Sequence, residues 1–440
     1  MKSLAEQTVW YQATFEAFEK SLNGEAGSEF HALRKKALAR FKELGFPTTR
    51  HEEWKFTNVT PIARTPFKPA PTRAGMVKES DLRFPDLTEN RLVFVNGQFD
   101  ASLSRIHRLP DKVVAGSLAE SLKRYSTTVG KHLGKHAPMD DHSFVALNTA
   151  FARDGAFIWI PEGKGNDEPI HVHFVATGDE NDLASPRNLF IVGDRARLSV
   201  IESYYSLRDG AYFTNAVTEL VVGEGATVEH DKLQDESLNS YHVSWTHSAQ
   251  ASRSTITSNL IALGGAIARS NIHASLDGAD CECTLNGLSI GTRSQLIDNH
   301  TAIDHATPHC ASHELYKAVL AGKSRGVFNG KIFVRKDAQK TDAKQTNKTL
   351  LLSDDAVMNT KPQLEIFADD VKCTHGATIG QLDADQVFYL RSRGLDLTSA
   401  QDMLTFAFAA DVVKRIHAKG LSEQLESMVN EKLEEGRKGS

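Results

Sequence analysis

The chain has 440 residues, of which 40% are hydrophobic and 24% charged, and its formal net charge is −5 at pH 7. This composition predicts a globular protein of two or three domains, and it excludes a disordered chain or one with a general attraction to nucleic acid or anionic lipid. The sequence shows no run of about 18 apolar residues and no export signal, and its four cysteines are too few for a disulfide framework, so we expect a cytoplasmic protein without a membrane span.

The first 45 residues predict helices. Apolar residues recur at helical spacing, Gly24 and Gly27 interrupt the pattern, and the segment EFHALRKKALARFKEL resumes it until Gly45. We therefore expect an N-terminal helical region over residues 1–60. Residues 61–155 are expected to form a mixed α/β connecting region, whose elements the sequence does not order.

Residues 156–384 consist of short, β-branched runs separated by glycine, aspartate and asparagine, such as NLFIVGD and VFNGKIFV. Strands of four to eight residues at near-regular spacing, with no helices between them, are typical of a sandwich, a barrel or a β-helix. Because a single sandwich rarely needs so many strands, the pattern favours a mainly β protein with a β-helix core over this range.

After Gln381 the helical pattern returns, which predicts a C-terminal helical domain over residues 385–440. Its second helix is expected to begin at Thr398 or Ser399, since both are suitable caps. Helices thus flank the β core on both sides in the sequence. We expect them to close both ends of the solenoid, because an apolar open end needs a cap.

The segment ADDVKCTHGATIG contains a candidate metal site. Side chains at positions i and i+2 of a strand lie on one face, roughly 6.5 Å apart, so Cys373 and His375 could reach one zinc or iron ion. They supply only two of the usual four ligands, and the others would come from elsewhere in the chain or from a partner. The alternative is that both side chains pack in the core, the commoner role of a single C-x-H in a strand.

A second pair of cysteines, Cys281 and Cys283 in DCEC, also shares a strand face. Two thiolates at this spacing could bind a metal, but compact zinc motifs use C-x-x-C. Buried thiols are therefore the better interpretation. A zinc-stabilised structural protein that uses these cysteines and a nearby histidine is the alternative.

Several histidines cluster in the segment NHTAIDHATPHCASHELYK. Three of them have the spacing that would align them on a helix as in zinc sites, but Pro308 argues against a continuous helix there. The H-E-x-x-H arrangement of metalloproteases is also missing from the segment. Polar turn and strand positions are the better interpretation for the histidines of this segment, which also contains a cysteine: His300, His305, His309, His313 and Cys310.

The sequence lacks the motifs of several common enzyme classes. There is no G-x-S-x-G elbow, no Walker A loop and no G-x-G-x-x-G fingerprint. Cys373 and His375 are too near in sequence to reach the usual geometry of a nucleophile and its base. Binding or scaffolding is therefore favoured over turnover, and we expect no enzymatic activity. A β-helix enzyme acting on polysaccharide is the alternative, although the strand run offers no obvious acid pair beyond Asp369 and Asp370.

Three parts of the chain resemble the SufB/SufD family of iron–sulfur cluster assembly proteins. They are FPTTRHEEWKFTN near the N-terminus, FVALNTAFARDGAFIWIPEG in the middle and, most specifically, the segment from ASHELYK to KPQLEIFADDVKCTHGATIGQLDADQVFYLRSRGL. The similarity extends over most of the chain from about Gly45 onward. The form KCTHGAT resembles the SufD branch of the family.

The resemblance implies a right-handed parallel β-helix flanked by helical regions. It also implies a scaffold subunit that pairs with SufB and works with the ATPase SufC to build a nascent iron–sulfur cluster and hand it over. His375 would then be a cluster ligand or a sulfur-path residue at the SufB interface, with Cys373 a nearby contributor. The C-terminal helices, about 385–430, would dock SufC, and a homodimer could form when the chain is alone.

Overall fold

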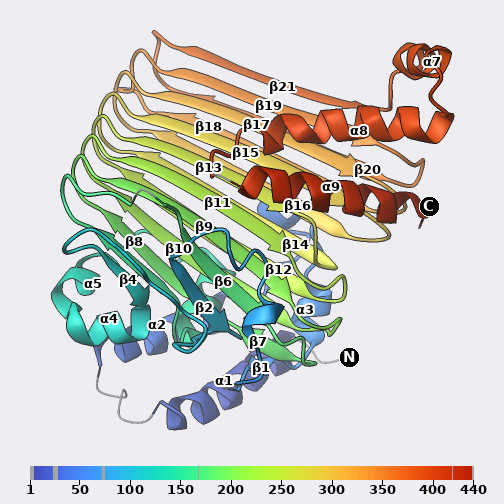
Figure 1. Cartoon of the computed structure of the whole chain (residues 1–440). Helices are drawn as coiled ribbons and strands as arrows, with labels where there is room; N and C mark the ends of the chain where they lie inside the picture. Colours follow the sequence, from blue (N-terminus) through green and yellow to red (C-terminus); the bar gives the residue numbers. More distant parts are fainter. Residues whose placement is uncertain (1–3, 23–27, 72–74, 167, 419, 439–440) are drawn as a thin grey trace.

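The computed structural model of the protein describes residues 4–22, 28–71, 75–166, 168–418 and 420–438. Its centre is a β-helix of about eight turns, in which two sheets of mostly parallel strands face each other across a narrow interior (Figure 1). From about residue 187 onward the chain alternates between the two sheets with each strand. The mainly β fold class with a β-helix core that the strand spacing predicts is thus confirmed.

We call the two sheets sheet A and sheet B. Sheet A contains, in spatial order, β20 (Val357–Ile366), β18 (Arg325–Val334), β16 (Leu296–His305), β14 (Ile267–Leu276), β12 (Tyr241–Gln250), β10 (Phe213–Val222), β8 (Arg187–Val192), β5 (Ala156–Ile160) and β4 (Val114–Ser117), with β1 (Lys68–Pro69) and β7 (Asp182–Ala184) beside this path. Sheet B contains β21 (Lys372–Gly380), β19 (Asp342–Leu351), β17 (Ala311–Leu320), β15 (Glu282–Gly291), β13 (Thr255–Ala262), β11 (Thr227–Asp235), β9 (Arg197–Ser206), β6 (Ile170–Ala176), β2 (Arg91–Val95) and β3 (Gln98–Phe99).

Successive turns stack without an offset. Each residue of β15 pairs with one residue of β17, and each residue of β17 with one of β19, over ten positions. Because side chains alternate between the two faces of a strand, equivalent positions form columns that point either into the interior or outward. On β19, Ala343, Gln345 and Asn347 are buried in the interior, whereas Lys344 and Lys348 are exposed outside.

The N-terminal end of the solenoid is closed by antiparallel pairing. β4 pairs antiparallel with β5, and β3 pairs antiparallel with β2, so residues from the region 61–155 contribute strands to both sheets. The helices are α1 (Leu4–Lys20), α2 (Glu29–Leu44), α3 (Thr60–Arg64), α4 (Leu118–Arg124), α5 (Ser126–His132), α6 (Ser143–Phe151), α7 (Ala384–Ser392), α8 (Leu397–Val413) and α9 (Leu421–Lys438), with 3₁₀ turns at Glu52–Trp54 and Glu79–Asp81.

The N-terminal helices pack on the outer face of sheet A. Aromatic rings of α1, α2 and α6 form one cluster, in which Tyr11 contacts Phe41 and Phe151, and the cluster continues to Phe213 of β10. The two helices expected in the first 45 residues are thereby confirmed. The predicted interruption at Gly24 and Gly27 lies outside the described residues.

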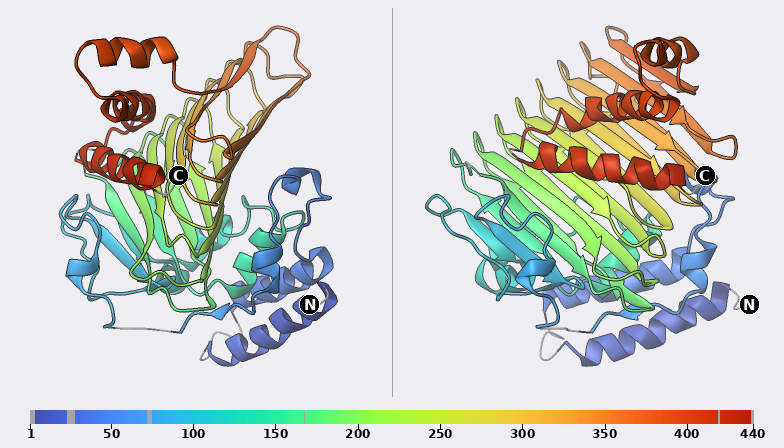
Figure 2. Two further views of the ribbon diagram at one scale, coloured as in Figure 1. Left: turned by 90° about the vertical axis from the view of Figure 1, so that its right-hand side faces the viewer. Right: turned by 45° about the vertical axis from the view of Figure 1, so that its right-hand side comes forward.

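The C-terminal helices lie on the opposite side of the solenoid, along the outer face of sheet B (Figure 2). Val412 of α8 and Leu425 of α9 belong to the same buried cluster as Leu288 and Val319 of the sheet. The expectation that helices close both ends of the solenoid is therefore wrong, since strands close the N-terminal end and both sets of helices lie along the faces of the sheets. The reason is that sheet B presents apolar side chains outward, and burying them along the face stabilises the fold more than covering the end.

The start of α8 also differs from the prediction. Asp396 is the N-cap, and its carboxylate accepts a hydrogen bond from the backbone N–H of Ser399 at 3.0 Å, so Thr398 and Ser399 already lie in the first turn. Aspartate is as good a cap as serine, and the pattern alone does not choose between them. Within the described ranges, none of the helices has both the length and the apolar character that a membrane span requires.

A buried ion pair ties the N-terminal region to sheet A. Arg187 of β8 and Glu219 of β10 are almost fully buried, and Arg187 Nη2 lies 2.7 Å from Glu219 Oε2. The same carboxylate accepts hydrogen bonds from the backbone N–H groups of Gly134, His136 and Ala137 at 2.8 to 3.0 Å. The loop between α5 and α6 is therefore attached to the sheet through one side chain.

We predict that Glu219→Ala lowers the free energy of unfolding by about 3–5 kcal/mol, because it leaves Arg187 buried without its counter-charge. Urea denaturation measures the change. Glu224→Ala is the matched control, since Glu224 pairs with Arg253 at the surface and should contribute no more than about 1 kcal/mol. Equal losses in the two variants would contradict this account of the loop.

The effect of Glu219 should also depend on pH. Burial alone would raise the pKa of this carboxyl, but Arg187 and the backbone N–H groups hold the pKa below its ordinary value of 4.5. A carboxylate with a lowered pKa stabilises the folded state fully above its unfolded pKa and loses this contribution as the pH falls through the folded pKa. The difference between wild type and Glu219→Ala should therefore be complete at pH 7 and shrink below about pH 4.5.

Candidate functional site

The C-terminal end of the solenoid is an open, exposed rung. β20 pairs with β18 and β21 pairs with β19, and each is the last strand of its sheet. Most residues of β21 are exposed, in contrast to those of β19 directly beneath it. In Figure 1 these strands lie at the far end of the stack from the N-terminal helices. Their outer backbone edges are therefore available for pairing with another strand.

Cys373 and His375 lie on this last rung. Cys373 pairs with Ala343 and His375 pairs with Gln345, both of which point into the interior. The shared register places both side chains on the inward face of β21, and Cys373 packs in the same cluster as Ala343. The structure therefore places the two predicted residues on one face, at the mouth of the interior.

The thiol of Cys373 is partly buried. Burial raises its pKa above the ordinary value, Asp342 adds to the effect, and a hydrogen bond with the backbone of Ala343 opposes it. At neutral pH the isolated chain thus holds a neutral thiol, which a metal or a cation brought by a partner would deprotonate. His375 is exposed on the same face, within reach of anything that covers the rung.

The cysteines at 281 and 283 are buried, as expected. Cys281 Sγ donates to the carbonyl oxygens of Ala251 and Gly278 at 3.1 and 3.0 Å, which is the behaviour of a neutral thiol. Burial strongly raises the pKa of Cys283, whose side chain points into the interior. Cys310 lies one turn after Cys281, and its Sγ is 3.4 Å from the same Gly278 carbonyl oxygen.

The histidines between 300 and 313 point in different directions. His305 faces the interior, where its Nε2 lies 2.9 Å from Ser312 Oγ, whereas His300 faces outward, with Nε2 3.0 Å from Asp298. His309 lies in a turn with a positive φ of 62°, and His313 is exposed on β17. The interpretation as polar turn and strand positions is confirmed. In the described parts of the chain, no three histidine, cysteine or acidic side chains are grouped so that they could hold a metal ion.

The sequence did not reveal a groove on the outer face of sheet A, with a volume of about 460 Å³. Its wall includes a stack in which the ring of Trp245 lies 4.1 Å from both His142 and His273. Burial lowers the pKa of both histidines, so their rings are neutral. Beside them the Arg269 guanidinium lies 3.7 Å from the centre of the Trp54 ring. These residues come from distant segments, and no local spacing connects them.

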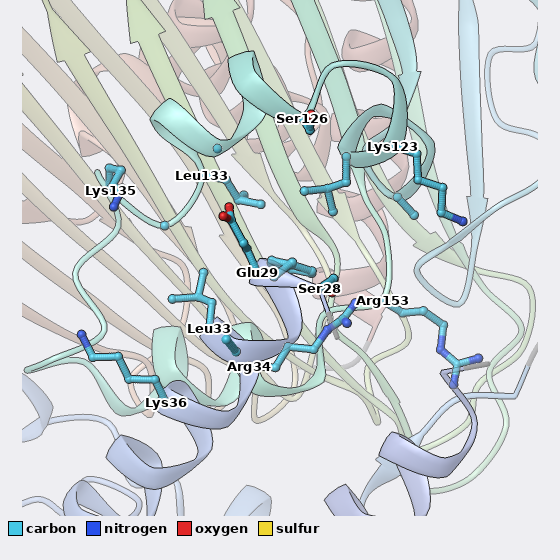
Figure 3. A pocket seen from close by; sticks show the side chains of 16 residues that line it. Ser28, Glu29, Leu33, Arg34, Lys36, Lys123, Ser126, Leu133, Lys135 and Arg153 are labelled. Atoms are coloured by element: carbon cyan, nitrogen blue, oxygen red, sulfur yellow. The ribbon is translucent and has the colours of Figure 1, made fainter. Parts of the chain in front are cut away.

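A second pocket, of about 560 Å³, lies between α2, α4 and α5 (Figure 3). Leu33 and Leu133 line it, and Lys36, Lys123 and Lys135 stand around its opening. The pocket is far along the chain from the last rung and belongs to the N-terminal half of the protein. Its positive rim could attract an anion, but it shares no residue with the Cys373 and His375 face.

Comparison with known proteins identifies the family over almost the whole chain. Residues 5–172 match the SufBD protein N-terminal region, and residues 174–408 match the SufBD core domain of SUF system FeS cluster assembly. An iron–sulfur cluster assembly SufBD family protein of Synechocystis is 34% identical over 88% of this chain and 87% of its own length. The iron–sulfur cluster assembly protein SufD of Escherichia coli is 32% identical over 91% of this chain and 92% of its own, and SufD of Bacillus subtilis is 26% identical over 91% and 93%. With this similarity and a β-helix of the expected architecture, the chain belongs to the SufB/SufD family and takes part in iron–sulfur cluster assembly.

Proposed function

We propose that the protein is a SufD-like, cytoplasmic scaffold subunit without enzymatic activity of its own. In this proposal it pairs with SufB through the last rung of the solenoid, shares a transient cluster with SufB, and binds the ATPase SufC through its C-terminal helices. The observation that carries the proposal is the position of Cys373 and His375 on the inward face of an exposed terminal strand. The cluster is cargo, built at the interface and then handed over.

The chemistry of the rung favours a site completed by a partner. A sulfur and an imidazole are good ligands for iron, but iron–sulfur clusters and zinc sites usually take four. Among the described residues, no third histidine, cysteine or acidic side chain is grouped with them, so we expect the further ligands to come from a partner at the open end of the solenoid. A second protein placed there would meet both Cys373 and His375.

The backbone of the last rung supports the same arrangement. β20 is ten residues long and β21 is nine. Each has a neighbouring strand on one side, so each presents a row of backbone N–H and C=O groups on the other side. Such an edge binds a further strand by main-chain hydrogen bonds. SufB is the proposed partner in the complete complex, and a second copy of this chain could occupy the same edge when SufB is missing.

The C-terminal helices present an apolar surface for SufC. Phe388 and Tyr389 of α7 have exposed fractions of 72% and 56%, and Leu397 and Met403 of α8 are also about half exposed. None of the residues of α7 is buried. Exposed aromatic side chains on a helix that packs little against its own protein are typical of an interaction site.

The two alternatives have less support. A zinc site at Cys281 and Cys283 would need thiolates, whereas Cys281 donates to two carbonyl oxygens and Cys283 is buried with a raised pKa. A polysaccharide-cleaving enzyme needs a pair of carboxyl groups free to act on a sugar. In the groove over sheet A, Asp298 is paired with Arg269 and Glu53 with His300.

The first prediction concerns the cluster. The complex of this chain with SufB and SufC is purified without oxygen, and iron and acid-labile sulfide are measured per complex. His375→Ala should leave the complex assembled but lower both contents by about tenfold or more, because the loss of a ligand weakens a metal site at least as much as the loss of a supporting group. Cys373→Ser should give a smaller loss, since the hydroxyl is a poorer ligand for iron than the thiol.

The matched control for this measurement is His313→Ala. His313 is also an exposed strand histidine of sheet B, but it faces outward on β17. It should leave iron and sulfide unchanged. If His375→Ala also leaves them unchanged in an intact complex, His375 is a structural residue and the proposed half-site is wrong.

The second prediction concerns SufC. The double variant Phe388→Ala and Tyr389→Ala should weaken SufC binding by roughly tenfold or more while the melting temperature of the isolated chain stays the same, since both rings are largely exposed. Calorimetric titration with purified SufC measures the affinity.

Val9→Ala is the control for an exposed apolar side chain elsewhere, because Val9 on α1 is 66% exposed. This variant should bind SufC as the wild type does. If the α7 double variant binds SufC with unchanged affinity, SufC does not bind at Phe388 and Tyr389.

A further inference from the structure

Three inward-facing side chains form a column that ends at the open rung. Glu314 of β17 pairs in register with Gln345 of β19, and Gln345 pairs in register with His375 of β21. Glu314 and Gln345 are 3% and 1% exposed, whereas His375 is exposed. A buried carboxyl group and one amide therefore lie in line with the candidate ligand.

The amide of Gln345 is held from two sides. Its Nε2 donates a short hydrogen bond to Glu314 Oε2. On the opposite sheet, a methyl group added at Gly330 would lie 2.3 Å from the same nitrogen, so glycine leaves just enough room for the amide to cross the interior. Gln345 is thus fixed in place by a hydrogen bond and by close packing.

The other end of the amide lacks a donor. Gln345 Oε1 is buried and has no hydrogen-bond partner, so it is an unpaired acceptor that an N–H group could satisfy. The residue that follows in the column is His375, whose ring carries an N–H in either neutral tautomer. A bond between them would remove the penalty of an unpaired buried acceptor.

We propose that Glu314 and Gln345 are positioning residues for His375. Glu314 fixes the amide nitrogen of Gln345, the amide oxygen accepts the ring N–H of His375, and the lone pair of the second ring nitrogen then faces the open end of the solenoid. A histidine that donates one N–H to a fixed acceptor is held in one tautomer and is a better metal ligand. This inference rests on the proposed function of His375.

The surroundings of Glu314 agree with such a role. Burial raises its pKa to about 7, while the Gln345 amide, which donates to it, and the nearby Thr301 hydroxyl act in the opposite direction. Tyr316 and Cys283 are its further titratable neighbours, and burial first, with the negative charge of Glu314 second, raises the pKa of both. At pH 8 the carboxyl therefore carries its charge and orients the amide most strongly.

The test uses the isolated chain without metal, labelled with ¹⁵N-histidine, at about pH 8. The resonances of His375 are assigned by their loss in His375→Ala. In the wild type we expect one protonated and one bare ring nitrogen, with well-separated ¹⁵N shifts. In Gln345→Met, which keeps the volume but removes the acceptor, the two shifts should move toward each other as both tautomers become populated.

Further variants make the test specific. Glu314→Met should give the same convergence of shifts, whereas Glu314→Gln should largely keep the wild-type pattern, because its carbonyl oxygen can still accept from Gln345. Asn347→Leu is the matched control: Asn347 is the next inward residue of β19, but it pairs with Ala377 and should leave His375 unaffected. Averaged tautomers in the wild type, or an unchanged pattern in both methionine variants, would overturn the proposal.

The experiment also separates this inference from the proposed function. The tautomer of His375 is measured without a cluster, without SufB and without SufC. If His375→Ala leaves the cluster content of the complex unchanged while the methionine variants shift the tautomer, the column exists but does not serve a cluster. If His375→Ala lowers the cluster content while the methionine variants leave the tautomer unchanged, His375 is a ligand and the column does not position it.

Discussion

The in-register stacking of parallel rungs determines where Cys373 and His375 lie. Because each strand of sheet B pairs with the next without an offset, an inward residue always rests on an inward residue of the rung before it. At the last rung the pattern stops, and the inward residues of β21 have a neighbour on one side alone. A shift of one residue in the pairing of β21 would turn Cys373 and His375 outward, away from the interior.

The two ends and the two faces of the solenoid are stabilised by different means. The N-terminal end is closed by antiparallel strands, and the outer face of sheet A is covered by helices through aromatic contacts, with the loop between α5 and α6 attached by the buried carboxylate of Glu219. The outer face of sheet B is covered by α8 and α9 through apolar contacts. Burial decreases toward β20 and β21. The exposed strands of the solenoid therefore lie at its C-terminal end, where the interior also opens.

The sequence could predict the β-helix and the relation between Cys373 and His375, because both depend on local periodicity. Strand spacing shows a repeating unit, and the period of two places residues 373 and 375 on one face. Whether that face is inside or outside depends on pairing with Ala343 and Gln345, about 30 residues earlier. Local spacing carries no information on that register.

Other features escaped prediction because they depend on contacts between distant segments. The column of Glu314, Gln345 and His375 follows a separation of about 30 residues, close to the length of one turn of the solenoid, but that repeat becomes visible only once the turns are known. The position of α8 and α9 along sheet B depends on which strand faces are apolar on the outside. In both cases the contacts of these residues depend on how distant segments pack, which local sequence patterns do not show.

The polar column has a cost that a purely structural core would avoid. Gln345 Oε1 and Glu314 Oε1 are buried without partners, and each unpaired atom destabilises the folded chain by about 1–3 kcal/mol. The interior of the earlier turns also holds polar side chains, but there the buried carboxylate of Glu202 lies 2.8 Å from His230 and accepts a hydrogen bond from the hydroxyl of Tyr204. Gln345 differs from the other buried polar residues in its place, because it pairs in register with the exposed His375 of the last rung. In the proposed arrangement, the amide oxygen of Gln345 gains a hydrogen bond when the ring of His375 is oriented toward a partner.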